Sequence, residues 1–247
     1  MKHYEDLVSQ TFDFPTEEFQ VVNSALHFHE IPLMEIIKTH GTPLKLSYLP
    51  KIGQNIRKAR RLFKDAMKKH HYSGDYLYCY CTKSSHFRFV VEEALKNGAH
   101  LETSSAYDLE IVKSLEKKGS IDKQSFIICN GFKRPLYLRN IAEVINDGFI
   151  NCIPVLDNLS EIEYYSNHIH IPWKAGIRVA ADEEPNFEFY TSRLGIRYSD
   201  VNEVFEKSIK NNPNVELKML HFFIHPGITD SAYFWSELSL SLIHISE

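Results

Sequence analysis

The feature that most constrains this chain is a regular alternation of short apolar runs with amphipathic segments, which begins near residue 54. The apolar runs have the length and residue types of strands, and most recur about 25 residues apart. They lie at residues 76–81, 99–103, 125–130, 149–155, 176–181 and 216–224. Strands separated by helices pair in parallel, because each helix carries the chain back along the sheet. The pattern predicts a parallel α/β fold, and both a barrel and an open doubly wound sheet satisfy it.

The segments between the strands are predicted to be helices. The first, NIRKARRLFKDAMKKHH, has apolar residues at helical spacing, and its basic residues are expected to form a solvated face. Two later helices are expected to end at Gly98 and Gly119. Residues 1–53 differ, because they mix short β-like stretches with a short helix. We therefore predict an N-terminal flanking segment at 1–53 and the α/β domain at 54–247.

Composition and charge limit the class of partner. Hydrophobic residues make up 43% of the chain and charged residues 24%, as in an ordinary globular protein. The net charge of −4 provides no positive field for nucleic acid or an anionic membrane. The N-terminus lacks a signal-peptide core, and no apolar run approaches the ~20 residues of a membrane helix. We expect a soluble, cytoplasmic protein without nucleic-acid or membrane partners.

Cysteine and histidine patterns give little support for a disulfide or a metal site. No CxxC pair occurs, and apolar surroundings favour reduced, buried thiols at Cys79, Cys81, Cys129 and Cys152. Histidine pairs occur at residues 27–29 and 168–170, but neither has an apparent third ligand. No phosphate-loop or serine-hydrolase motif is present. No metal is therefore predicted.

One lysine stands where parallel α/β folds place their reactive groups. Lys83 comes two residues after the run YLYCYC, and the carboxyl ends of parallel strands form the functional edge of such sheets. An amine held there near apolar walls loses hydration, so its pKa falls and it becomes a nucleophile for an aldehyde. On position alone, a solvated loop lysine is the more common case.

A series of motifs around Lys83 favours the reactive lysine over the solvated one. GTPLKLSYL is followed by YSGDYLYCYCTKSSHFRFVVEEALKNGAHLETSSAYDLEIV, IICNGFKRPLYLRNI, SRLGI and MLHFF. In this order and spacing, over about residues 41 to 237, the stretches resemble the pyridoxal-phosphate decarboxylases of the alanine-racemase fold. The resemblance is closest to biosynthetic arginine decarboxylases. It implies a (β/α)8 TIM-type barrel and pyridoxal 5′-phosphate as the cofactor.

The resemblance also assigns roles to residues at the strand ends. Lys83 would form the internal Schiff base with pyridoxal phosphate and would later help to move protons. Glu102 would support the cofactor side of the barrel mouth, or would be a strand-end charge paired with an arginine. Ser105 and Asp108 match a serine and an acidic position of the family. Asp108 is also interpreted as a first-turn acid that favours the helix dipole.

Two further matches lie on later strands. Asn130 ends the run SFIICN and would line the site or fix the loop, whereas Gly131 beside it indicates a tight turn. Arg178 lies inside the apolar run GIRVAA, where a buried charge needs a partner. This position favours a polar network at the barrel centre, near the cofactor.

The stretch MLHFFIHPG departs from the resembled family, which usually has HFHxGS here. In the family, the second histidine packs on the cofactor ring, and alignment puts Phe223 in its place. His221 and His225 flank Phe223 at period two. Phe223 would stack on the ring, or His225 would replace the histidine after a bulge. The alternative is a core phenylalanine between two solvated histidines.

The resemblance implies a small-molecule substrate, an amino acid that is decarboxylated, with arginine converted to agmatine for polyamine biosynthesis. Decarboxylation of diaminopimelate, ornithine or carboxynorspermidine, and cofactor binding without catalysis, remain as alternatives. A homodimer or higher homo-oligomer is expected for the full-length protein, because a partner subunit lends residues to the site in this family.

The C-terminal stretch SELSLSLIHISE follows six predicted strands, whereas a complete barrel has eight. We therefore expect a truncated chain and an incomplete barrel of about six βα units. The family's glycine-rich phosphate loop, its acid at the pyridine nitrogen and its partner-subunit residues have no counterpart here. We expect the full-length protein to be a decarboxylase and the 247-residue fragment to have little or no activity.

Overall fold

The computed structural model describes residues 18–180 and 194–222, and its contacts divide the chain into two compact units, Met1–Tyr48 and Leu49–Glu247. In the first unit, an antiparallel sheet is followed by a short helix, as the sequence predicts. These elements are β1 (Phe19–Val22), β2 (Ala25–Phe28), β3 (Ile31–Pro32) and α1 (Leu33–His40). The division into domains at residues 1–53 and 54–247 stays a prediction.

A parallel sheet forms the second unit, as predicted. Its six main strands are neighbours in chain order, and every pairing between them is parallel. The strands are β4 (Cys79–Cys81), β5 (His100–Thr103), β6 (Ile127–Cys129), β7 (Cys152–Leu156), β8 (Trp173–Ala180) and β10 (Val215–His221). The short strand β9 (Ile196–Arg197) pairs in parallel with the end of β8.

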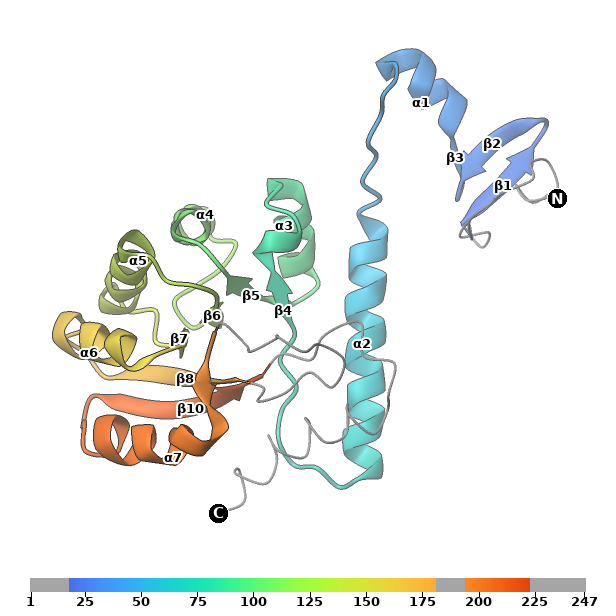
Figure 1. Cartoon of the computed structure of the whole chain (residues 1–247). Helices are drawn as coiled ribbons and strands as arrows, with labels where there is room; N and C mark the ends of the chain where they lie inside the picture. The colour runs from blue at the N-terminus through green and yellow to red at the C-terminus, as the bar shows by residue number, and fades with distance from the viewer. Residues whose placement is uncertain (1–17, 181–193, 223–247) are drawn as a thin grey trace, which may run out of the picture. The chain divides into compact units, whose positions relative to one another are not determined.

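Helices follow the strands and lie in an arc along the outer side of the sheet (Figure 1). They are α3 (Arg88–Lys96), α4 (Ala106–Lys117), α5 (Pro135–Asn146), α6 (Leu159–His168) and α7 (Val201–Val204), the last continued by the π-helical turn η4 (Phe205–Ile209). Before them, α2 (Pro50–Lys69) starts at a proline, earlier than the periodicity from residue 54 predicts. Within the described ranges, no helix is long and apolar enough to cross a membrane.

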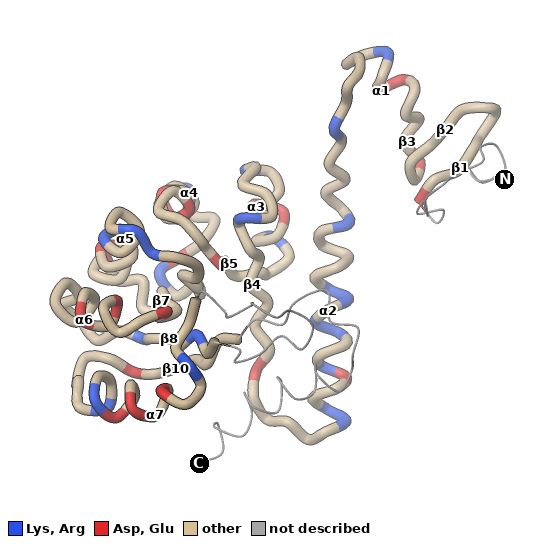
Figure 2. The backbone as a smooth tube through the Cα atoms, viewed as in Figure 1, with Lys and Arg blue, Asp and Glu red and all other residues tan. Residues whose placement is uncertain are grey.

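The basic residues of α2, spread along the helix in Figure 2, are not only a solvated face. Arg57 donates a hydrogen bond to the Asn97 side chain, and Arg60 donates to the carbonyl groups of Asn97 and Gly98. These carbonyls follow the C-terminal end of α3, where the helix dipole is negative. Two arginines therefore attach α2 to α3.

The strands carry two apolar layers, because successive side chains point to opposite faces. The outer layer packs under the helices and includes Leu101, Ile127 and Ile177. The inner layer is smaller and contains Ile128, Ile153 and Val155, with Cys79, Phe126 and Met219 against them. Polar residues follow the inner layer toward the carboxyl ends of the strands, and this order defines the candidate site.

Candidate active site

Strand register places several predicted site residues on the inner face of the sheet. Cys81 pairs with Glu102, and Arg178 pairs with His221. Cys81 and His221 each lie two residues after a member of the inner apolar layer on the same strand, and their pairing partners share their face. Because side chains alternate along a strand, all four side chains point to the inner face. All of them lie at or near the carboxyl end of a strand. The sequence predictions for Glu102, Arg178 and His221 therefore converge on one edge.

Contacts join these strand ends into a polar chain, formed by Cys81, Glu102, Asn130 and His221. The Asn130 amide nitrogen Nδ2 lies 3.1 Å from Glu102 Oε1 and 3.3 Å from His221 Nε2. The Cys81 thiol donates to the same Glu102 oxygen at 3.7 Å. The polar chain thus links the ends of β4, β5, β6 and β10 across the inner face, and Asn130 is its centre.

His221 is neutral in this setting. Burial, and next the positive charge of Arg178, holds the pKa of His221 below its ordinary value. Because Asn130 Nδ2 only donates, His221 Nε2 accepts, and the ring proton is on Nδ1. His221 Nδ1 and Asn130 Oδ1 are both buried without a hydrogen-bond partner among the described residues. His221 Nδ1 can therefore donate, and Asn130 Oδ1 can accept, a hydrogen bond from a ligand at the carboxyl edge of the sheet.

The cysteines are all free, but only two are as buried as predicted. Cys129 and Cys152 are buried with their sulfur atoms 3.6 Å apart, whereas Cys79 and Cys81 are half-buried. Burial, and then the charge of Glu102, raises the pKa of Cys79 to about 11 and also raises the pKa of Cys81. Both thiols therefore stay protonated at neutral pH, and Cys81 acts as a hydrogen-bond donor rather than a nucleophile.

Lys83 lies in the 3₁₀ turn η2 (Thr82–Ser84), directly after β4. Thr82 anchors this turn, because its side chain is buried and its hydroxyl donates to the Glu102 carbonyl at 3.0 Å. Lys83 itself is exposed, so the expectation of an amine between apolar walls is wrong for the described structure. The turn lies just beyond the carboxyl end of β4. No other described residue forms a hydrogen bond or ion pair with the Lys83 amine, which leaves it free to react.

Ser105 and Asp108 have a structural role at the start of α4. Ser105 is the N-cap, and its hydroxyl accepts from the Asp108 amide while the Asp108 carboxylate accepts from the Ser105 amide. This capping box satisfies backbone donors at the helix start. Asp108 is fully buried. The interpretation of Asp108 as a first-turn acid is therefore confirmed, and a cofactor contact by Ser105 stays a prediction.

Both interpretations of the Asn130 region apply. Gly131 has a φ of +84°, a conformation that residues with a side chain rarely adopt, and makes the turn after β6. That turn leaves the Asn130 side chain on the inner face, in the polar chain. Phe223 and His225 lie outside the described residues, so their predicted roles stay predictions.

A buried ion cluster at the same edge was missed by the sequence reasoning. Lys133 Nζ lies 3.4 Å from Asp157 Oδ2 and 3.0 Å from Glu161 Oε2, and it also donates to the Gly131 and Val155 carbonyl groups. Burial raises the pKa of Glu161, although Lys133 opposes the shift. The Lys133 cluster, formed by Lys133, Asp157 and Glu161, fixes the loop after β6 to the end of β7. The sequence signal that could have indicated Lys133 is the stretch ICNGFK, which resembles the family motif and ends at this lysine.

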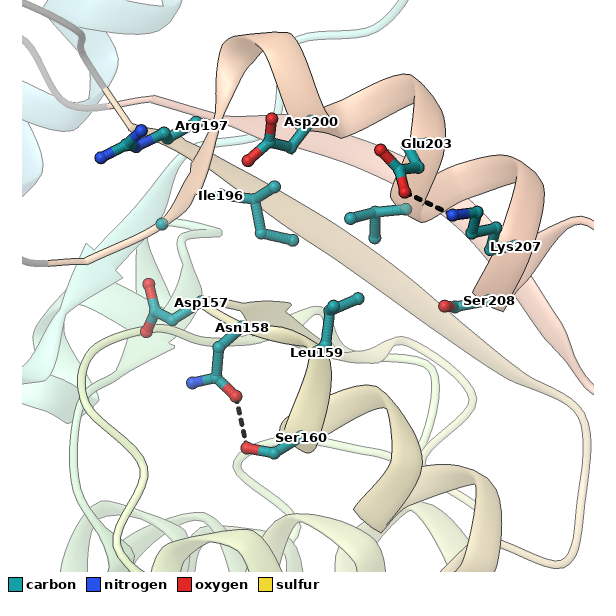
Figure 3. Close-up of a pocket in the computed structure, with 12 residues that line it drawn as sticks. Asp157, Asn158, Leu159, Ser160, Ile196, Arg197, Asp200, Glu203, Lys207 and Ser208 are labelled. Atoms are coloured by element: carbon teal, nitrogen blue, oxygen red, sulfur yellow. Dashed lines mark hydrogen bonds and ion pairs between the residues drawn. The ribbon is translucent and has the colours of Figure 1, made fainter.

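A cavity of about 620 Å³ adjoins the Lys133 cluster through Asp157. Figure 3 shows it between the start of α6 and the segment from β9 to η4. Charged and polar residues on its walls partly pair with each other, as Glu203 does with Lys207 and Ser160 with Asn158. The described residues contain no group of three His, Cys, Asp or Glu side chains that would hold a metal ion.

The inner edge fits a polar, anionic ligand such as pyridoxal phosphate. Within the described part of the chain, it offers an unpaired acceptor on Asn130 and an unpaired donor on His221. Lys83 supplies a primary amine for an aldehyde, and Arg178 supplies a second positive charge. The sheet, the lysine after β4 and the polar chain are those of a parallel β/α domain with a candidate ligand site at its carboxyl edge.

Comparison with known proteins identifies the class. Residues 54–245 match the family described as "Pyridoxal-dependent decarboxylase, pyridoxal binding domain". The chain therefore belongs to the pyridoxal-phosphate-dependent decarboxylases, and this segment is their cofactor-binding barrel domain.

Individual curated relatives share about a quarter of their residues with this chain over the aligned region. Biosynthetic arginine decarboxylase of Vibrio vulnificus strain YJ016 is 25% identical over 240 residues, which cover 85% of this chain and 37% of the relative. That of Escherichia coli K12 is 24% identical over 231 residues, which cover 84% of this chain and 35% of the relative. The chain thus spans little more than a third of the length of these curated relatives.

Solved structures support the fold. Diaminopimelate decarboxylase from M. jannaschii, in complex with L-lysine, superposes with a TM-score of 0.75 at 16% identity, covering 92% of this chain and 52% of that one. The arginine decarboxylase of Paramecium bursaria Chlorella virus superposes with a TM-score of 0.63 at 15% identity, covering 85% and 52%. Both similarities concern the barrel fold that the sequence resemblance implies.

Proposed function

We propose that the full-length protein is a decarboxylase of basic amino acids that converts arginine to agmatine, with pyridoxal phosphate held on Lys83. The observation that carries the proposal is the placement of Lys83 in a turn anchored to Glu102, at the edge where the polar chain lies. The motif series and the arginine decarboxylases among the relatives favour arginine as the substrate. The activity is proposed for the whole protein, of which this chain supplies the cofactor-binding barrel.

Each residue of the edge has a proposed part. Pyridoxal phosphate supplies an electron-accepting ring on which an amino acid can lose its carboxylate. Lys83 Nζ holds the cofactor and, when free, carries a proton for the substrate carbon. Glu102 and His221 orient the ligand, and Asn130 keeps them in place through its two contacts. Arg178 contributes positive charge, which adds to the effect of burial in lowering the pKa of His221.

Substrate class is tested by CO2 release from the full-length protein with arginine, ornithine, lysine, diaminopimelate and carboxynorspermidine. The expected result is the highest kcat/KM for arginine, with agmatine as the product, and no turnover by Lys83→Ala. Preference for another amino acid would replace arginine in the proposal. Cofactor attachment without CO2 release from any of them would make the protein a non-catalytic pyridoxal-phosphate binder.

We also propose that the full-length protein is a homodimer or higher homo-oligomer. Large apolar side chains are exposed on successive segments after the strands: Phe87 after β4, Tyr107 after β5, Phe132 after β6 and Leu159 after β7. Four exposed apolar side chains at one edge are typical of an interaction surface. A partner subunit over this edge would also close the site to water.

A further inference from the structure

We propose that His86 is a positioning residue for Lys83 and acts through Asp108. The inference rests on the proposed function of Lys83. His86 lies three residues after Lys83, in the segment between η2 and α3. Its Nε2 atom is 2.7 Å from Asp108 Oδ1, which belongs to the next strand–helix unit. This contact connects the two loops that follow β4 and β5.

Asp108 is a fixed partner for this contact. Its other oxygen, Oδ2, accepts from the Ser104 amide at 2.8 Å and from the Ser105 amide at 3.0 Å. Asp108 Oδ1 is buried and has no hydrogen-bond partner among the described residues, and the His86 ring lies within ion-pair distance of it. A buried carboxylate oxygen strongly favours a nearby cation or donor, because it has lost its water. The capping box of α4 thus presents one free oxygen to the Lys83 segment.

The Lys83 segment is held at three points. Thr82 donates to the Glu102 carbonyl before Lys83, and the Tyr80 hydroxyl donates to the Ser85 carbonyl at 3.1 Å after it. His86 is the third point, and unlike the others it ties the segment to a neighbouring helix. Lys83 is exposed, so packing does not fix its position. Without His86, we expect the segment after Ser85 to move more freely and the amine to be less well placed for an aldehyde.

The test compares His86→Ala with His86→Gln in the full-length protein. The glutamine amide keeps a donor where histidine has Nε2, whereas alanine removes it. We expect His86→Ala to weaken retention of pyridoxal phosphate on Lys83 about tenfold, equal to about 1.4 kcal/mol, and His86→Gln to restore it. In the cofactor-free protein, hydrogen exchange of residues 84–91 should also become about tenfold faster in His86→Ala only.

A matched control is His168→Ala. This histidine is exposed and contacts the Tyr164 carbonyl at 2.7 Å, but it lies at the C-terminal end of α6, away from the carboxyl edge. It should change neither measurement. Unchanged retention and exchange in His86→Ala would overturn the inference, as would equal loss in both His86 variants. If wild-type Lys83 itself takes no cofactor, the proposed function fails instead, and hydrogen exchange alone still tests the contact.

Discussion

His221 shows how one half-buried side chain makes the site sensitive to pH. Its pKa is lowered in the folded state, so the unfolded chain binds the proton more readily. The contribution of His221 to stability is complete above the unfolded pKa of about 6.5 and is lost as the pH falls below it. Urea unfolding between pH 8 and pH 5 should show a smaller acid-induced loss for His221→Gln than for the wild type. The exposed His168→Gln should follow the wild type, and an equal loss in all three proteins would contradict the prediction.

Lys133 is the buried cation on which two carboxylates at the same edge depend. Lys133→Ala would leave Asp157 and Glu161 without it, and we expect a loss of about 3–5 kcal/mol in the free energy of unfolding. Lys113 is the control, because it pairs with Glu143 at the surface and Lys113→Ala should cost only about 0–1 kcal/mol. Denaturant unfolding of the two variants measures the difference. Equal costs would show that the Lys133 cluster is not what holds the loop after β6.

At the scale of elements, helix α6 depends on its cap. Asn158 accepts from the Glu161 amide at 3.1 Å, and Glu161 also belongs to the Lys133 cluster. Asn158→Ala should therefore lower the free energy of unfolding by about 1 kcal/mol, the usual effect of removing an N-cap. The exposed Glu163→Ala on the same helix should change it by less than about 0.5 kcal/mol. Similar urea midpoints for both variants would argue against the cap.

The elements could be predicted from the sequence where local pattern and tertiary packing agree. Helix α6 coincides with the stretch LSEIEYYSNH, because an N-cap and an apolar face mark it. Strand β4 covers only the last half of the run YLYCYC, because pairing with β5 begins at Cys79. The start of α2 at Pro50 and the π-helical turn after α7 could not be predicted, because periodicity does not identify a first turn or an extra residue in a turn.

The site was predictable only in part, for a related reason. Strand order and the resemblance were enough to bring Glu102, Asn130 and His221 to one edge. The exposure of Lys83 and the contact of His86 with Asp108 depend on how loops pack against each other, which strand periodicity does not encode. The same holds for the Lys133 cluster, because a lysine four residues after a strand, as Lys133 is after β6, is usually solvated.

At the scale of the whole molecule, the exposed apolar side chains at the carboxyl edge predict association. Replacing Tyr107 and Phe132 together by serine should lower the oligomeric state of the full-length protein in sedimentation velocity. The effect follows because both side chains are large, apolar and more than half exposed. Tyr72→Ser removes an aromatic side chain of similar exposure next to α2 and should leave the oligomer unchanged. An unaltered oligomer in the double variant would place the interface elsewhere.

The central claim is that Lys83 holds the cofactor, and reductive trapping tests it most directly. The full-length protein is mixed with pyridoxal phosphate, reduced with borohydride and digested, and the labelled peptide is located by mass spectrometry. We expect one pyridoxyl group on the peptide that contains Lys83, and none there in Lys83→Arg, which keeps the charge without the primary amine. A label on another lysine, such as Lys133 or Lys174, or no label at all in the wild type, would contradict the account.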